Sequence, residues 1–527
     1  MKPFDANGAF APSVPGGGHA LRRMAVRGAG ATLISGGIAL AIQIVATVVL
    51  GRLLTPRDFG LATMVTTFSL LLMNGPANGF IDSILQRRDI THDLASTLFW
   101  ISLGIGLLLT AGFAAAGPLM SRFYGEPPLT TLTAGFSLTV ILTALPIIHA
   151  SLLRRAMRFT ALAKNDIIAR AVGVLTSIAF GFAGWGYWSL VMGAVALAAS
   201  TAVGLFILCP WIPGPPRRRV GGVSTIKFAS HISGRFTLNY FARNSDNLLV
   251  GWRFGAPALG FYKKAYDLFA LSAGQLVSAT SNVAVSALSR VRDDRPQYIR
   301  YVLGAIAVMS FLGMGLAGDL TLIGKDLIRV LLGPNWSTAG VIFTWFAPGI
   351  GVMIVYYIHG WIHVSIGRAD RWFLWSIVEW IVTFGSFLVF LPFGPQGIAV
   401  AWCATYWLLI IPSMAYAGKP IGLGAGQVVG TVWRYVAASL AASLVSWFVM
   451  RSIPALEDIP GGAGAALRIA LVSILFSTLY LGAVVMLHGG TQPLRRILRL
   501  LDELRGKSRA NTVEANHPTG GVEAANV

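Results

Sequence analysis

Charged side chains are scarce in this sequence. Only 12% of its 527 residues are Asp, Glu, Lys or Arg, about half the share of roughly 25% that soluble domains carry. Hydrophobic residues make up 55% of the chain, and the mean hydropathy is +0.68. This shortage of charge excludes a soluble cytosolic enzyme, because the chain has too few polar groups to solvate a globular surface.

Cysteine and acidic residues are scarce as well. The two cysteines, Cys209 and Cys403, lie far apart and form no CxxC motif, so the sequence predicts neither a disulfide framework nor a cysteine metal site. The 21 acidic residues are outnumbered by 41 basic ones, which gives a net charge of +20. In a soluble protein this balance would favour nucleic acid, but in a membrane protein the position of the basic residues indicates topology.

Long apolar runs are what the chain has in abundance. A helix needs about 20 apolar residues to cross a bilayer core, and strands of a membrane barrel would alternate instead. The sequence therefore predicts an all-α polytopic membrane protein with about 14 transmembrane helices. The predicted spans are 29–50, 59–80, 95–117, 129–150, 165–183, 186–208, 228–250, 259–285, 299–321, 339–365, 373–391, 396–417, 431–450 and 465–487.

Basic residues concentrate on one side of these spans. If the N-terminus is cytoplasmic, cytoplasmic segments hold 27 of the 41 and the opposite loops hold 7. Cytoplasmic loops of membrane proteins are enriched in Lys and Arg. We therefore expect both termini to lie in the cytoplasm.

Composition also predicts the division of the chain into segments. A Gly/Pro/Ala-rich disordered tail and a Pro/Gly/Arg-rich linker separate the apolar blocks, and the C-terminal end is predicted to be amphipathic and then disordered. The expected segments are a cytoplasmic tail (1–28), a first half (29–208), a linker (209–224), a second half (225–417), two further spans (418–487) and a cytoplasmic tail (488–527).

The two halves contain a sequence repeat. A shift of 200 residues places VVLGRLLTPRDFGL over LLVGWRFGAPALGF. Six predicted spans separate the copies, so both halves run in the same direction, a plan known from transporters with parallel repeats. The matched positions are Gly51 with Gly251, Phe59 with Leu259, Gly60 with Gly260 and Leu61 with Phe261.

Spans seven and eight carry unusually many polar residues. Such groups are expensive in lipid, so they are expected to face an interior cavity. An alternative is that Arg243 and Asp246 form a buried pair that only locks helices together. One helical stripe holds Arg235, Asn239, Arg243, Asp246 and Asn247, and a second holds Lys264, Asp267, Gln275, Ser278 and Asn282.

The segments GRLLTPRDFGL (51–61), ARNSDNLLVGWRFGAPALGFYKKAYDL (242–268) and SALSRVRDD (286–294) resemble the Wzx-type polysaccharide exporter family. The family belongs to the multidrug/oligosaccharidyl-lipid/polysaccharide superfamily, and the branch is similar to the colanic-acid and succinoglycan exporters. The resemblance implies two six-helix lobes around a central cavity plus two extra helices. It also implies a bacterial inner-membrane flippase that moves undecaprenyl-pyrophosphate-linked oligosaccharides by alternating access, in concert with a polymerase and a chain-length regulator.

The polar residues can be assigned roles on that basis. A pyrophosphate needs cationic or hydrogen-bonding partners in a low-dielectric core, and the substrate-path candidates are Arg235, Asn239, Arg243, Lys263, Lys264 and Gln275. The candidates for ion coupling, or for neutralising charge pairs, are Asp246, Asp267 and Glu379. No cofactor is expected, and the coupling ion, H⁺ or Na⁺, stays open.

Other functions are less favoured by the residues. His359 and His363 have metal-compatible spacing but no neighbouring carboxylate, so no metal site is predicted. A membrane polymerase or ligase would need a large outward loop with catalytic groups, which the sequence does not offer; we expect no enzyme. A drug/cation antiporter of the same superfamily is the nearer alternative, but it would favour acidic rather than basic residues in spans seven and eight.

Overall fold

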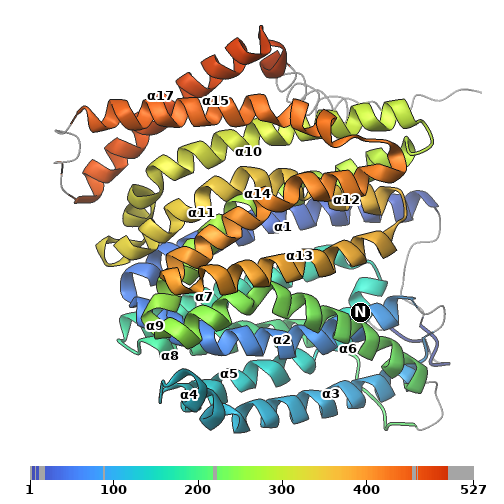
Figure 1. Ribbon diagram of the computed structural model, residues 1–527. Helices are drawn as coiled ribbons and strands as arrows, with labels where there is room; N and C mark the ends of the chain where they lie inside the picture. The colour runs from blue at the N-terminus through green and yellow to red at the C-terminus, as the bar shows by residue number, and fades with distance from the viewer. Residues whose placement is uncertain are drawn as a thin grey trace, which may run out of the picture. The chain divides into compact units, whose positions relative to one another are not determined.

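The computed structural model describes residues 3–5, 7–10, 18–86, 90–217, 222–453, 459 and 461–495 (Figure 1). The described backbone is almost entirely helical, apart from two isolated β-bridges near the N-terminus. Three short 3-10 turns, Pro334–Trp336, Leu391–Phe393 and Lys419–Ile421, link some of the helices. The α-helices are α1 (Gly18–Leu53), α2 (Pro56–Gln86), α3 (His92–Ala115), α4 (Gly117–Tyr124), α5 (Leu129–Ala144), α6 (Ile147–Arg155), α7 (Phe159–Phe182), α8 (Tyr187–Leu208), α9 (Gly222–Arg290), α10 (Arg295–Leu332), α11 (Ser337–Tyr356), α12 (Ile358–Ser365), α13 (Ala369–Phe390), α14 (Gly394–Gly418), α15 (Ala425–Arg451) and α17 (Gly461–His488).

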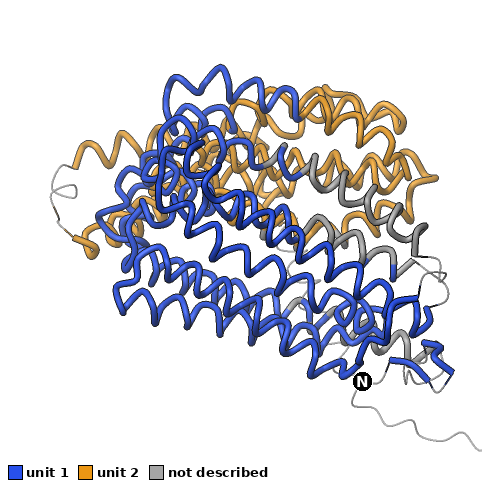
Figure 2. Tube along the Cα trace, turned by 90° about the horizontal axis from the view of Figure 1, so that it is seen from below, with its two compact units in different colours: residues 1–268, 325–345, 380–402 blue, residues 269–324, 346–379, 403–527 orange. Residues whose placement is uncertain are grey.

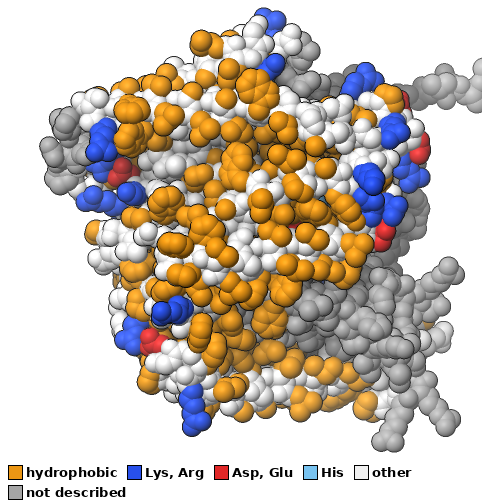
Figure 3. Space-filling model, in the orientation of Figure 1, with side chains coloured by type: hydrophobic (Ala, Val, Ile, Leu, Met, Phe, Trp, Pro, Cys, Tyr) orange, Lys and Arg blue, Asp and Glu red, His pale blue; other side chains and the backbone are white. Residues whose placement is uncertain are grey.

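The all-α membrane fold predicted from the sequence is confirmed. Each predicted span falls mainly on helical backbone, and eleven stretches of the described residues are long and apolar enough to cross a membrane. Hydrophobic side chains cover much of the face in Figure 3, while Lys and Arg lie near helix ends. Large apolar residues such as Leu108 and Ile207 are more than two-thirds exposed, as expected where the surrounding solvent is lipid. The exact count of fourteen helices stays a prediction.

Two predicted spans are divided in the structure. The span at 129–150 breaks between α5 and α6 at Pro146, and the span at 339–365 breaks between α11 and α12 at Tyr357. Proline has no backbone N–H and clashes with the preceding turn, which explains the first break. Pro348 lies inside α11 without ending it.

The described helices form two compact units, each assembled from separate stretches of the chain (Figure 2). Unit 1 comprises residues 1–268, 325–345 and 380–402, and unit 2 comprises residues 269–324, 346–379 and 403–527. The division into a first half, a linker and a second half stays a prediction.

The predicted linker (209–224) is described at 209–217 and at 222–224, and residues 222–224 already form the start of α9 rather than a linker. Residues 209–217 belong to unit 1. This stretch is non-helical and lies against the first turns of α3. The Gly214 N–H donates to Ser96 Oγ at 2.9 Å, Trp100 Nε1 donates to the Gly214 carbonyl at 2.9 Å, and Arg217 Nη1 donates to Asp93 at 2.5 Å. Residues 93, 96, 97 and 100 recur at helical spacing, so one polar face of α3 holds the segment in place.

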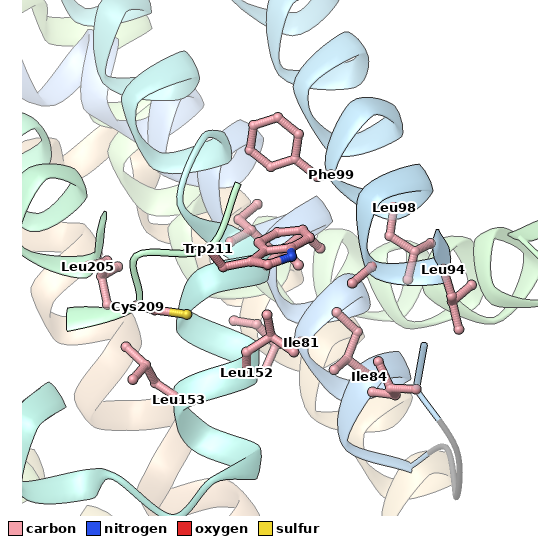
Figure 4. Packing of buried hydrophobic residues seen from close by; sticks show 14 of the residues in the cluster. Ile81, Ile84, Leu94, Leu98, Phe99, Leu152, Leu153, Leu205, Cys209 and Trp211 are labelled. Atoms are coloured by element: carbon pink, nitrogen blue, oxygen red, sulfur yellow. The ribbon is translucent and has the colours of Figure 1, made fainter. Parts of the chain in front are cut away.

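A buried hydrophobic cluster includes part of this segment (Figure 4). Its members come from α2, α3, α5, α6 and α8, together with Ile90 and with Cys209 and Trp211 of the segment. The N-terminal residues, predicted as part of a disordered tail, contribute as well. Phe4 packs against Trp211 with ring centroids 5.9 Å apart, and Phe10 N–H donates to the Ile90 carbonyl at 3.1 Å. Two aromatic side chains thus fix this short stretch to the cluster, although its overall Gly/Pro/Ala-rich composition predicts disorder.

Candidate functional site

Helix α9 carries both polar stripes and changes direction between them. Gly255 has φ 81° and ψ −179°, and Pro257 follows two residues later. Side-chain-bearing residues rarely adopt a φ of this sign, and proline removes a helical hydrogen bond. The single element α9 is therefore two helical arms joined at Gly255, where the sequence predicts the boundary between spans seven and eight.

The two copies of the repeat pack against each other within unit 1. A Cβ atom at Gly60 would collide with the carbonyl oxygen of Ala256, and one at Gly260 would collide with the carbonyl oxygen of Pro56. Under the shift of 200 residues, Gly60 corresponds to Gly260 and Pro56 to Ala256. The contact is therefore reciprocal, as in an isologous two-fold interface, and it requires a missing side chain on both sides.

A second reciprocal pair flanks the first. A Cβ at Gly51 would lie 2.6 Å from Leu332 Cδ2, and one at Gly251 would lie 3.0 Å from Tyr124 Cε1. Leu332 and Tyr124 are the last residues of α10 and α4. Each precedes a glycine with positive φ, 99° in one case and 70° in the other. The repeat detected from a few matched letters is thus a repeat of packing, and all four of its glycines make close contacts.

Aromatic side chains surround this contact. Trp336 Nε1 donates to the Gly51 carbonyl at 2.6 Å. The Trp336 ring lies edge-on to Phe59 and Phe261, with centroids 5.5 and 5.9 Å apart. Phe59 in turn offers its face to Lys264, whose Nζ lies 3.8 Å from the ring centroid.

Lys264 is the described basic candidate without a direct ion pair, since Asp267 pairs with Lys263 and acts on Lys264 only from a greater distance. It is half-buried, and among the described residues it makes no ion pair. An aromatic face stabilises a desolvated ammonium by about 2 kcal/mol, less than a full counter-ion would. The ammonium group can therefore still bind an anion.

Lys263, the neighbouring residue, is arranged differently. Its Nζ donates to Asp267 Oδ1 at 2.5 Å, an i,i+4 pair on the second arm of α9. Asp267 is therefore paired in this structure, and its role in coupling or in neutralising charge stays a prediction. Lys263 remains a path candidate only if that pair opens.

Asp246 lies on the first arm of α9 and is fully buried. Its carboxylate accepts from Tyr262 Oη at 2.7 Å, from Trp402 Nε1 at 3.0 Å and from the Asn247 N–H at 2.8 Å. These three neutral donors occupy both carboxylate oxygens. Asp246 thereby links the two arms of α9 and connects them to α14.

The remaining predicted residues lie elsewhere or outside the description. Glu379 is on α13, in unit 2, where it interacts with the Tyr356 hydroxyl. The backbone at 235, 239, 243 and 275 is helical, but the side chains of Arg235, Asn239, Arg243 and Gln275 lie outside the described residues. The proposed Arg243–Asp246 pair is therefore not tested, and Asp246 has other partners.

Tyr262, Trp336 and Trp402 were missed as site residues. Trp336 is completely buried. Their partners lie far away in sequence, 285 residues for Trp336 and 156 for Trp402, and no local pattern reports such pairings. The one available signal was that an Asp in an apolar span needs donors.

The comparisons with known proteins agree with this geometry. Residues 49–340 match the family described as polysaccharide biosynthesis proteins. The chain belongs to this family. It is 21% identical to the succinoglycan biosynthesis transport protein ExoT of Rhizobium meliloti (strain 1021), over 74% of this chain and 78% of that one. It is 23% identical to the teichuronic acid biosynthesis protein TuaB of Bacillus subtilis (strain 168), over 68% and 74%.

The fold is that of a membrane transporter. It is similar to the lipid II flippase MurJ in an inward closed conformation, with a TM-score of 0.66 and 15% identity, covering 86% of this chain and 98% of that one. The resemblance inferred from the sequence is confirmed. This member of the polysaccharide biosynthesis family is a multi-pass membrane transporter rather than an enzyme.

Proposed function

We propose that the protein flips undecaprenyl-pyrophosphate-linked oligosaccharide repeat units across the bacterial inner membrane, by alternating access, for exopolysaccharide or surface polysaccharide synthesis. Both termini lie in the cytoplasm, and a polymerase and a chain-length regulator act on the product. Support comes from the relatives, one named as a succinoglycan biosynthesis transport protein and one as a teichuronic acid biosynthesis protein, and from the positive-inside charge pattern.

Lys264 carries the inference that the cargo is anionic. A membrane-embedded ammonium is costly unless it has a partner or a function, and here its described partner is the face of Phe59. A pyrophosphate oxygen would complete its coordination with a charge-assisted hydrogen bond. A cationic drug would instead meet a like charge at this position.

The reciprocal glycine contacts support alternating access. They join the two repeats at the ends of spans that the charge pattern places on the non-cytoplasmic side. At these glycines the surfaces meet through backbone, Leu332 and Tyr124, which are uncharged groups. Such a contact is small and reversible, which suits a surface that closes in one state and opens in the other.

A deletion strain tests the function. We expect loss of the surface or secreted polysaccharide and accumulation of lipid-linked repeat units on the cytoplasmic side, both reversed by the wild-type gene. Unchanged polymer together with new sensitivity to cationic drugs would instead support the drug/cation antiporter. Exported but unpolymerised repeat units would indicate a polymerase, and either result would overturn the proposal.

A further inference from the structure

Two histidines are buried on α12, within unit 2. His359 is 3% exposed and His363 is 0% exposed. His359 Nδ1 is bonded to the Tyr356 carbonyl at 2.5 Å, whereas His359 Nε2 and both ring nitrogens of His363 have no hydrogen-bond partner among the described residues. Most buried polar atoms have a partner, so three unpartnered nitrogens on adjacent turns require an explanation.

These rings form one line of groups that can exchange protons. The Tyr356 hydroxyl interacts with Glu379 and accepts from Trp375 Nε1 at 2.8 Å. The Tyr356 ring lies 4.5 Å from the His359 ring, and the His359 ring lies 6.1 Å from that of His363, measured between centroids. The line therefore leads from a carboxylate on α13 to the last turn of α12.

The line runs from the end of its helices toward the middle of the membrane. Glu379 lies ten residues after Ala369, the first residue of α13, which corresponds to about 15 Å along a helix, or about half of a hydrocarbon core. His363 is in the last turn of α12. The loop between them holds Arg368 and belongs to a side that the charge pattern predicts to be cytoplasmic.

Charged and aromatic side chains surround the His363 end of this line of groups. The charged groups that act on His363 are Arg368, Asp370 and Arg371. Arg371 Nη2 donates to the Tyr416 carbonyl at 2.6 Å, and its guanidinium lies 4.2 Å from the centre of the Tyr416 ring. Further ionisable side chains near the line are Tyr357, which acts on Tyr356, and Tyr298, whose hydroxyl is 2.5 Å from Ser365 Oγ. The Tyr406 ring lies 5.5 Å from that of Tyr356, and the Tyr416 ring lies 5.8 Å from that of His363.

We propose that Tyr356, His359 and His363 form a proton relay that connects Glu379 to the Arg368–Arg371 end of α13. Glu379 gives its proton to the Tyr356 oxygen as the Tyr356 O–H gives its own to His359 Nε2. That imidazole then releases a proton from Nε2 to His363 and returns to neutral, so only O–H and N–H bonds form and break. His359 Nε2 has no hydrogen bond to the Tyr356 hydroxyl or to His363, so ring rotation or a bridging water spans each of these two gaps. The inference rests on the proposed transport function, for which the relay supplies the coupling protons.

The relay can be tested without any sugar substrate. In purified full-length protein in lipid nanodiscs, infrared spectroscopy detects the protonated carboxyl band that Glu379→Gln removes. After transfer to D₂O, we expect His359→Phe and His363→Phe each to slow hydrogen–deuterium exchange of this band by about tenfold or more, because positioned acid–base groups typically contribute factors of that size. Phenylalanine retains the aromatic packing, and thermal melting verifies folding.

His149→Phe is the matched control. His149 is fully buried, one ring nitrogen lies 3.1 Å from the Trp211 carbonyl, and Nδ1 has no partner among the described residues, so it resembles His359 without belonging to the line. Unchanged exchange in both relay variants would overturn the proposal, as would a protein with no Glu379 band at any pH at which it is folded. If both histidine variants slow the exchange but the protein does not export lipid-linked sugar, the proposed cargo is wrong and the proposed relay still holds.

Discussion

The charged residues on the two arms of α9 differ in how many partners the protein gives them. On the first arm, Asp246 is surrounded by donors from Tyr262, Trp402 and the backbone. On the second arm, Lys264 has an aromatic ring beneath it and no described counter-ion. A charge whose hydrogen-bonding capacity is filled by the protein holds the structure together, whereas one with capacity left over can bind cargo.

Removing the Asp246 carboxylate is expected to have the largest effect. Asp246→Ala would remove the carboxylate that accepts from the Tyr262 hydroxyl and from the Trp402 N–H, and a buried donor that loses its acceptor costs about 1–3 kcal/mol. We expect a strongly lowered melting temperature and little folded protein, measured by size-exclusion chromatography and thermal melting in detergent.

Asp246→Asn separates a structural role from a coupling role. The amide retains an acceptor oxygen but cannot take up or release a proton at neutral pH. A structural Asp246 predicts a folded variant that still exports polysaccharide. Folded protein without export would show instead that Asp246 belongs to the coupling mechanism.

Neutralising Lys264 is expected to reduce export without reducing folding. A hydrogen bond to a charged group contributes about 1.5–3 kcal/mol, so Lys264→Gln should slow translocation roughly 10- to 100-fold. The measurement is the rate of polysaccharide accumulation at matched protein levels. Lys264→Arg keeps the positive charge and should retain much of the rate. Equal export by the wild type, Lys264→Gln and Lys264→Arg would contradict the proposal that an anionic cargo passes Lys264.

The repeat shows how far sequence reasoning reaches. Gly51, Gly60, Gly251 and Gly260 were found by a shift of 200 residues, because a position that must lack a side chain leaves a visible letter. Nothing in the sequence indicated that Gly60 packs against the carbonyl of Ala256 and Gly260 against that of Pro56. The reciprocal register depends on packing between helices, which single-sequence patterns do not encode.

The histidine pair shows the complementary limit. The spacing of His359 and His363 is compatible with a metal site, but the sequence places no carboxylate nearby and therefore predicts no such site. It indicates no other role for the two imidazoles. Glu379 and Tyr356 complete the line from two other helices, so the alternative use of the imidazoles could be recognised only after α11, α12 and α13 had been placed together in unit 2.

Adding one carbon at the reciprocal contact tests whether it is a required interface. Gly60→Ala and Gly260→Ala each direct a Cβ into a carbonyl of the other repeat, and overpacking of this kind costs about 1–3 kcal/mol. We expect reduced export and a lower melting temperature for both. Gly104→Ala is the control, because a Cβ there meets nothing within 4 Å, and it should be neutral or slightly stabilising. Equal behaviour of the three variants would show that the contact is dispensable.

The pair on the second arm of α9 should matter least. The Lys263 and Asp267 side chains are 29% and 44% exposed, and a partly exposed ion pair typically contributes about 0.2–1 kcal/mol. Asp267→Asn is therefore expected to lower the melting temperature by little and to leave Lys263 with a free ammonium group next to Lys264. If basic side chains line the substrate path, this variant should retain export and can bind an anionic lipid-linked cargo more tightly. Measuring the export rate at increasing substrate supply would detect the tighter binding. A loss of export as large as that of Lys264→Gln would mean that Asp267, and not the unneutralised lysine, controls transport.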